Sequence, residues 1–491
     1  GSSCLPCPGT EPPQSPHSCT EHPQSICGNM EASMSEMPTR TRLSYACFSL
    51  ALFLALGSYQ FVSPVKQALF FDLVGTGSEP LAKSLVLVVL VPALLLYSVL
   101  FSAVSDPKRL MLYVGGFFSA MYTLVAIILE SSAGHPGAWL AWLLYYLTEF
   151  RAVVLMPMIW SIINDVTTSE LAKVTYPLIF FVIQVGGITG SFVAIHVSSL
   201  GGIVGLLLIQ ATVILLIIAL TWCGCVLIHP PEEEHDPERV PLTGGQQVPA
   251  PGQQASDSRT PEPTKSKKAS MSILYEAVEG LWLLVSRPYA FMTFWVSYAT
   301  LMPRTVLDYT NGVLVKGAFP DRDGQVAFWG RMSLGQNCAT AALTLLGTKA
   351  IVEALGLGRA LLVLPITVLC AVLAVCVHYG LWVSVFAVVT SSVIAYGLNS
   401  PCKEMLYIRT SREIKYKAKS WSEMYGNELM KLLGAQINLW VNNDNDTCRP
   451  DCFHEFPTLI IVVLWISVWL SVAWRVGSEH RRLEESGQIV E

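Results

Sequence analysis

Two long stretches without a single Asp, Glu, Lys or Arg constrain this chain more than any other feature. They are residues 174–228 and 360–402, and shorter apolar stretches recur along the rest of the sequence. Of the 491 residues, 52% are hydrophobic and only 14% are charged, whereas ordinary soluble domains carry about 25% charged residues. A helix needs about 20 mostly apolar residues to cross a bilayer. We therefore expect an integral membrane protein and not a soluble enzyme.

The spans are expected to be helical, because the period-two alternation of membrane β-barrels is absent. Residues 174–228 and 360–402 are each long enough for two crossings, with breaks expected at Gly201-Gly202 and at residues 378–380. The sequence thus predicts an all-α polytopic membrane protein with twelve transmembrane helices in two six-helix halves, which is the plan of the major facilitator superfamily. The single crossings are expected at residues 43–62, 84–105, 110–129, 138–163, 288–311, 326–348, 420–441 and 457–474.

Composition divides the chain further. A polar segment rich in Gly, Gln and Pro lies between the halves and is typical of a disordered linker. Four N-terminal cysteines, including the Cys4-x-x-Cys7 pair, lack the second half of a zinc pattern, and Pro, Ser and Gln surround them. The expected division is a disordered N-terminal segment at 1–42, a first half at 43–228, a linker with a surface helix at 229–287, a second half at 288–475 and a tail at 476–491.

Lys and Arg are distributed unequally between the two sets of loops, and this predicts the orientation. With both termini cytoplasmic, the inside loops, the linker and the tails hold a large excess of these residues over the outside loops, as the positive-inside rule requires. The linker and the C-terminal tail would then be cytoplasmic. The loop at 442–456, with the sequon at Asn445 and the Cys448/Cys452 pair, would face the opposite side. The membrane stays open between plastid envelope, plasma membrane and a secretory membrane.

Several function classes are disfavoured. The net charge of -5 argues against a nucleic-acid-binding domain. The phosphate-binding loop of nucleotide hydrolases is absent, as are a nucleophile elbow and the His-Glu-x-x-His metal pattern. We expect neither an enzyme nor a bound metal or cofactor.

Charged residues inside the expected spans are the strongest functional signal, since burying a charge in a bilayer costs a few kcal/mol. Two sets can pair within one helix: Arg304 with Asp308, and Glu428 with Lys431. Arg151 has Leu147 and Leu155 one turn away and must find a partner on another helix, in water or on a ligand. The full set comprises Glu149, Arg151, Arg304, Asp308, Arg331, Glu423, Glu428 and Lys431, with Lys66 at the end of the first span.

Two interpretations of these charges remain. They are either intrahelical pairs and residues that reach the membrane surface, or the lining of a watery cavity for an anionic substrate. Aromatic residues in the spans usually belong to the core or to the interfacial belt, although some could stack on a nucleobase. The candidates for stacking are Tyr59, Trp160, Phe180, Trp329 and Trp440.

Motifs along the chain resemble the ATP/ADP translocase (nucleotide transporter) family of plastids and obligate intracellular bacteria. Residues 401–408, PCKEMLYI, with the alternating lysines of 415–419, resemble that family's PCKEMAYIP and KxKxK segments. Residues 164–173 with Tyr176-Pro177-Leu178 resemble its NQITTxxEAKxxYPL segment, and residues 59–69 and 286–289 agree in order. The resemblance covers roughly residues 43–474.

The resemblance implies a nucleotide transporter, most simply an ATP:ADP antiporter that alternates access to a central site. The family's four transport residues fall on Lys66, Glu149, Asp308 and Lys431, where Asp308 replaces a Glu. A second set of candidates comprises Arg151, Arg304, Arg331, Lys403, Glu404 and Glu423. The chain departs from the family at Ser63-Pro64, where the family has Arg-Asp, which rearranges the cavity charge.

The implied partners are a nucleotide substrate and the lipid bilayer, with ATP and ADP as transported substrates. Two alternatives stay open: a major-facilitator transporter for another nucleotide, another organic anion or a lipid, and a non-transporting membrane scaffold. Retention of all four charge signs favours transport over the scaffold.

Overall fold

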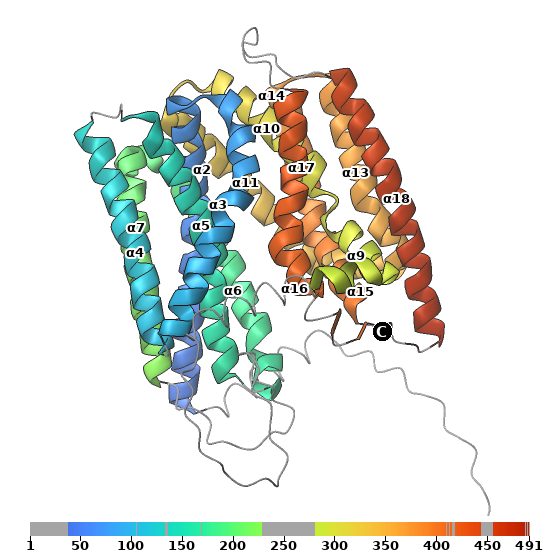
Figure 1. Cartoon of the computed structure of the whole chain (residues 1–491), viewed down its shortest axis with the longest axis horizontal. Helices are drawn as coiled ribbons and strands as arrows, with labels where there is room; N and C mark the ends of the chain where they lie inside the picture. The colour runs from blue at the N-terminus through green and yellow to red at the C-terminus, as the bar shows by residue number, and fades with distance from the viewer. Residues whose placement is uncertain are drawn as a thin grey trace, which may run out of the picture.

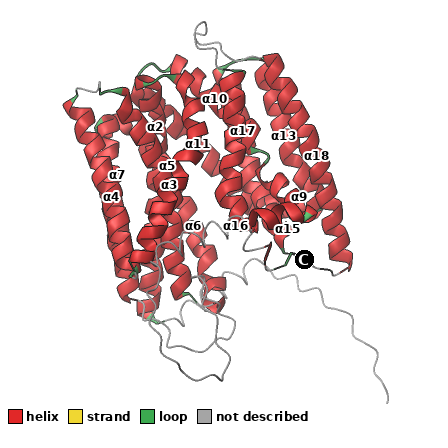
Figure 2. Ribbon diagram, viewed as in Figure 1, coloured by secondary structure: helices red, strands yellow, loops and turns green. Residues whose placement is uncertain are grey.

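The structure is a computed structural model, and it describes residues 38–104, 106–132, 136–167, 169–227, 280–408, 410–411, 413–414, 418–442, 455–486, 488 and 490. Within these ranges the chain forms helices, and an isolated bridge between Thr410 and Val490 is the only extended pairing (Figure 2). The all-α prediction is confirmed.

The first group of helices packs around a continuous apolar core that includes Phe48, Phe70 and Phe118. Each helix crosses the bundle in the direction opposite to the one before it (Figure 1). The helices are α2 (Thr39–Leu73), α3 (Glu79–Ala103), α4 (Pro107–Ser131), α5 (Ala138–Val166), α6 (Ser169–Ile195) and α7 (Gly202–Leu227).

The second group packs around its own apolar core, in which Trp469 is fully buried, and lies beside the first group in Figure 1. It contains α9 (Pro288–Tyr298), α10 (Leu301–Ala318), α11 (Arg322–Ala342), α12 (Thr348–Leu355), α13 (Leu357–Val377), α14 (Leu381–Ile394), α15 (Ser400–Tyr407), α16 (Lys419–Trp421), α17 (Asn427–Trp440) and α18 (Glu455–Ser486).

Helix breaks agree with the expected turns. Gly201 and Gly202 have φ values of 88° and 67°, a left-handed backbone that glycine adopts without steric cost, and they separate α6 from α7. Residues 378–380 separate α13 from α14. The expected crossing at 288–311 differs, because it is divided into α9 and α10 and ends later, at Ala318.

Nine helices of the described part are long and apolar enough to cross a membrane. The other three expected crossings correspond to α3, to the interrupted pair α9 and α10, and to α17, which has a charged face. The total of twelve crossings therefore stays a prediction. The boundaries of the expected halves, linker and tails stay predictions too.

Small residues allow α2 and α6 to pack closely. A Cβ atom on Gly190 would overlap the backbone of Gly57, and one on Gly186 would overlap the backbone of Phe53. Contact between helix backbones through glycine is a common way to join helices in lipid, where the hydrophobic effect between helices is weak. The fit fixes the position of α2, which carries Lys66.

The two groups of helices meet along α2, α3 and α6 on one side and α11 and α17 on the other. Asn337 of α11 donates to Ser191 of α6 at 3.1 Å, and Gln436 of α17 donates to Ser84 of α3 at 2.8 Å. We call the end of the bundle where α2 joins α3 the α2–α3 face. At this face, Asp72 lies 3.1 Å from the Lys316 amino group and 2.5 Å from the Arg322 guanidinium. These contacts hold the two groups together there.

Several expectations fall on residues outside the described ranges. They are the N-terminal cysteines, most of the linker with its surface helix, Lys415 and Lys417, and the loop that carries Asn445, Cys448 and Cys452.

Candidate functional site

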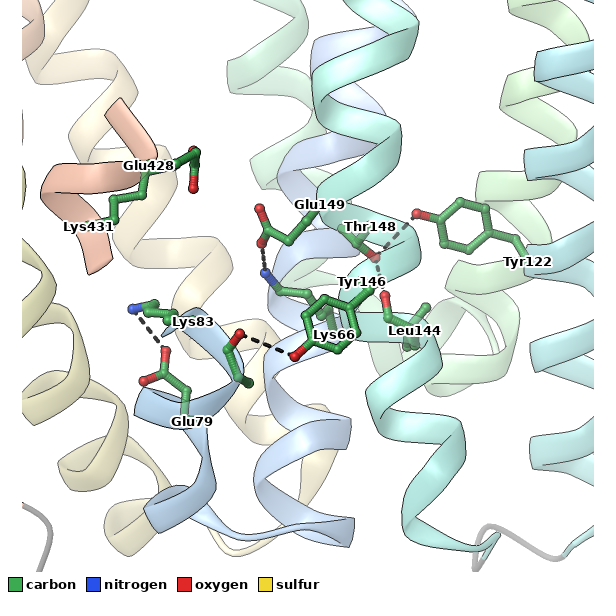
Figure 3. A network of polar contacts seen from close by, with 11 residues as sticks. Lys66, Glu79, Lys83, Tyr122, Leu144, Tyr146, Thr148, Glu149, Glu428 and Lys431 are labelled. Atoms are coloured by element: carbon green, nitrogen blue, oxygen red, sulfur yellow. Dashed lines mark hydrogen bonds and ion pairs between the residues drawn. The ribbon is translucent and has the colours of Figure 1, made fainter. Parts of the chain in front are cut away.

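An ion pair between Lys66 of α2 and Glu149 of α5 lies on the side of the first group that faces α17 (Figure 3). The Lys66 side chain is 8% exposed and that of Glu149 is 18% exposed. The Lys66 amino group also lies 4.3 Å from the centre of the Tyr145 ring, a cation–π distance. Lys66 therefore has two partners at a depth where an unpaired charge would be costly.

Lys431 of α17 pairs with Glu428, one turn away on the same helix, at 2.7 Å. This confirms the pairing expected from their spacing. The Lys431 side chain is 37% exposed, so it remains accessible at the boundary between the two groups. Lys431 also interacts electrostatically with Glu149 and Tyr59, both from the first group. Lys66 and Lys431, the two lysines that the family resemblance pointed to, thus lie on opposite sides of one region.

Asp308 of α10 pairs with Arg304 at 3.5 Å, which confirms the second expected intrahelical pair. The Arg304 guanidinium lies 5.4 Å from the centre of the Tyr396 ring. Among the described residues, Asp308 forms an ion pair with neither Lys66 nor Lys431, because Lys431 pairs with Glu428 and Lys66 with Glu149.

A further pair, absent from the expected set, joins the same region. Lys83 lies one turn into α3 and pairs with Glu79 at 2.8 Å. Lys83 interacts electrostatically with Asp308 across the boundary and with Lys66 beside it. The crossing expected at residues 84–105 begins just after Lys83, because the apolar run starts there, and so leaves Lys83 outside the span. The Glu-x-x-x-Lys spacing, which suits an (i, i+4) pair on a helix, is the signal that could have identified it.

These side chains form what we call the central charge cluster, at the boundary between the two groups of helices. Four helices of the first and second groups contribute its lysines and their carboxylate partners, and α10 contributes Asp308. Its members are Lys66, Glu79, Lys83, Glu149, Asp308, Glu428 and Lys431. Three cations whose partners are all carboxylates can exchange those partners for phosphate oxygens, so the cluster can receive a polyanion without an unpaired charge remaining.

Arg151 does not contact this cluster through an ion pair. It is 2% exposed, and its Nη2 donates to the Ala55 carbonyl at 3.0 Å and to Ser58 Oγ at 2.5 Å, both on α2. With its amide oriented to satisfy both groups, Gln210 of α7 accepts from Arg151 Nε at 2.9 Å. Of the three kinds of partner expected for Arg151 (another helix, water or a ligand), the structure shows groups on other helices. Arg151 joins α5 to α2 and α7.

Lys403, Glu404 and Glu423 belong to a separate network near the end of the bundle opposite the α2–α3 face. Lys419 lies 2.7 Å from Glu404 and 4.0 Å from Glu423, and Lys403 lies 3.8 Å and 3.9 Å from the same two carboxylates. The structure therefore separates these three second-tier candidates from the central charge cluster. Arg331 is exposed on α11.

The aromatic candidates separate in the same way. Tyr59 interacts electrostatically with Glu149 and Lys431, so it lies at the central charge cluster. Trp329 is 6% exposed and packs against Phe71 at 6.0 Å. The Trp160 and Phe180 rings pack against each other at 5.1 Å, and Trp440 is 80% exposed. Of the five candidates, Tyr59 is therefore the one that we place beside the central charge cluster.

The apolar helices of the described part are those of a multi-pass membrane protein, and their arrangement is a fold of the major facilitator type. Residues 61–230 match the family model described as TLC ATP/ADP transporter. The predicted resemblance to the ATP/ADP translocase family is confirmed by this match and by similarity to a curated protein, ADP,ATP carrier protein 2, chloroplastic, from Arabidopsis thaliana. That relative is 24% identical over 501 aligned positions, which cover 90% of this chain and 75% of the relative.

Solved structures support the fold. A variant of the nucleoside transporter NupG aligns with a TM-score of 0.54 at 14% identity, over 89% of this chain and 99% of that chain. A bacterial homologue of the human lysosomal transporter Spinster aligns with a TM-score of 0.53 at 10% identity, over 91% and 98%. An auto-inhibited POT family peptide transporter aligns with a TM-score of 0.54 at 14% identity, over 91% and 97%.

Proposed function

We propose that this protein carries nucleotides across a membrane by alternating access, with ATP:ADP exchange as its activity. The observation that carries the proposal is the central charge cluster, which places Lys66 and Lys431 on opposite sides of the boundary between two groups of helices. The match of residues 61–230 to the TLC ATP/ADP transporter family supports the nucleotide as substrate.

In the proposed mechanism, Lys66 and Lys431 bind the phosphates from opposite sides. Glu149 and Glu428 hold the two amino groups when the site is empty, and they are released when the phosphate oxygens take their place. Tyr59 lies near Lys431 and near Glu149, the partner of Lys66, and would contact the nucleotide. Asp308 holds Arg304 and balances the charge of the site. The two groups of helices then rock around the bound substrate.

Opening of the site at the α2–α3 face requires that the ion pairs there break. Asp72 with Lys316 and Arg322 closes this face, so these ion pairs break whenever the site opens there. We infer that the termini and the linker are cytoplasmic, so the α2–α3 face is the outer one. Cleavage of the linker by a protease added outside intact cells would contradict this orientation.

Transport by the purified full chain in proteoliposomes tests the function. Uptake of labelled ATP into vesicles loaded with ADP is expected to exceed uptake into empty vesicles severalfold, since an antiporter needs a counter-substrate. Equal uptake into loaded and empty vesicles would show that the protein works by uniport or ion-coupled uptake and not by exchange. Uptake of other organic anions without nucleotides would favour the alternative transporter, and no uptake of either kind would favour a scaffold.

A further inference from the structure

Lys83 and Glu79 form the one pair in the central charge cluster that the proposed mechanism does not use. Glu79 is 1% exposed, and one of its oxygens, Oε1, lies 2.8 Å from the Lys83 amino group. The other oxygen, Oε2, is buried with no hydrogen-bond partner in the structure. A buried carboxylate normally satisfies both oxygens, so this arrangement is costly and needs an explanation.

Lys83 is a third cation beside Lys66 and Lys431, in a position where it could bind part of an anionic substrate. Its side chain is 23% exposed, against 8% for Lys66, so its amino group is the more accessible of the two. It interacts electrostatically with Lys66 on the neighbouring helix and with Asp308 across the boundary. Figure 3 shows Lys66, Lys83 and Lys431 around one region, with Lys83 nearest to the start of α3.

Lys83 lies closer to the α2–α3 face than Lys66 does. Lys83 lies four residues after the start of α3 at Glu79, and Lys66 lies seven residues before the end of α2 at Leu73. With a rise of about 1.5 Å per residue, Lys83 is roughly one turn closer to the α2–α3 face than Lys66. A phosphate chain that started between Lys66 and Lys431 and extended toward this face would come to Lys83 last.

We propose that Lys83 binds the terminal phosphate of the nucleotide, and that Glu79 is the positioning residue that holds Lys83 until the substrate arrives. The proposal rests on the proposed nucleotide transport. Because Glu79 holds Lys83 through a single contact and stays buried, the lysine can turn to a phosphate oxygen while the carboxylate remains close to it. The number of phosphates then decides how many cations are engaged, so Lys83 discriminates between a triphosphate, a diphosphate and a monophosphate.

Equilibrium binding of ATP, ADP and AMP to the purified full chain tests this. Lys83→Gln alone leaves Glu79 buried without a partner and can unfold the protein, so the main variant is the double substitution Lys83→Gln with Glu79→Gln, which keeps the pair neutral and hydrogen-bonded. We expect ATP affinity to fall about tenfold or more, the usual loss for a hydrogen bond to a charged group. ADP affinity should fall less, and AMP affinity should stay within twofold. The separate variant Lys83→Arg keeps a cation beside Glu79, so it should prefer ATP as the unmutated chain does.

The matched control is the Lys349–Glu353 pair, which has the same (i, i+4) spacing but lies exposed on α12. Its double replacement by Gln should change none of the three affinities. A purely structural role for Lys83 would lower ATP, ADP and AMP binding equally, and this result would overturn the inference.

The outcomes also separate this inference from the proposed function. If the unmutated chain binds ATP and Lys66→Gln abolishes binding, but the double variant binds as the unmutated chain does, only the role of Lys83 is wrong. If the unmutated chain binds no nucleotide, both are wrong.

Discussion

Lys66 on α2 and Glu149 on α5 form an ion pair that connects two helices of the same group, and the lysine also faces the Tyr145 ring. Lys431, on the other side of the boundary, has its own carboxylate in Glu428. The two lysines therefore do not depend on each other's helices for charge balance. Each side of the site is neutral by itself, which allows the two groups of helices to move apart without separating opposite charges.

Substitutions in the Lys66–Glu149 pair are predicted to affect thermal stability and ATP uptake differently. Glu149→Gln should destabilise the protein by about 3 kcal/mol, because it leaves a buried cation without its partner. Exchanging the charges, with Lys66→Glu and Glu149→Lys together, should restore most of the thermal stability but not ATP uptake, since the cation then projects from the wrong helix. Thermal unfolding in detergent and uptake by proteoliposomes measure the two effects. Recovery of uptake in the exchanged variant would show that the position of the cation is unimportant.

Arg151 is predicted to stabilise the helix packing and not to select the substrate. Arg151→Gln removes its bonds to Ala55, Ser58 and Gln210 and should lower the stability by at least about 3 kcal/mol, from hydrogen bonds to a charged group. The ratio of ATP to ADP affinity should not change. Arg109→Gln, at a side chain that is 70% exposed on α4, is the matched control and should leave the stability unchanged. A changed affinity ratio in Arg151→Gln would place this residue at the substrate.

Asp72 is predicted to control opening at the α2–α3 face. Asp72→Asn weakens the contacts to both Lys316 and Arg322, so a larger fraction of molecules should be open there. Gln67→Cys, in a chain whose native cysteines are replaced, should then react severalfold faster with a membrane-impermeant maleimide added from that side. An unchanged labelling rate would mean that these ion pairs do not limit opening.

Asp308 is predicted to act through its charge and not through its size. Asp308→Glu, which introduces the residue of the related family, should support uptake close to the unmutated rate. Asp308→Asn removes the partner of Arg304 and should slow exchange more than it weakens ATP binding. Separate measurement of binding and of uptake distinguishes the two, and equal losses in both would assign Asp308 a direct contact with the nucleotide.

The sequence predicted the fold class because a bilayer limits the chain to helices, and each helix needs a long apolar run. It also predicted the pairs Arg304–Asp308 and Glu428–Lys431, because partners three or four residues apart share a helix face. The breaks at Gly201-Gly202 and at residues 378–380 followed from composition. The division of residues 288–318 into α9 and α10 was not predicted, although Pro303 in the first turn of α10 is a signal that could have marked it, because proline cannot continue a helix from the preceding turn.

Contacts between helices were beyond such reasoning. Lys66 and Glu149 are 83 residues apart, and the rotation of each helix about its axis decides whether they meet. Arg151 was identified as a buried cation, but its partners are uncharged groups on α2 and α7 that carry no sequence signal. Lys83 was missed because a hydrophobic run was taken to mark the start of the helix, whereas α3 begins before it, at Glu79.

The central claim is that Lys66 and Lys431 bind the phosphates of a transported nucleotide from opposite sides of the site. Uptake of labelled ATP into ADP-loaded proteoliposomes, compared for the unmutated chain, Lys66→Ala, Lys431→Ala and the exposed control Lys349→Ala, tests this claim most directly. We predict that uptake is lost in Lys66→Ala and in Lys431→Ala, although both variants insert in the membrane, and that it is unchanged in Lys349→Ala. Uptake at the unmutated rate in both Lys66→Ala and Lys431→Ala would contradict the account, because the nucleotide would then bind elsewhere.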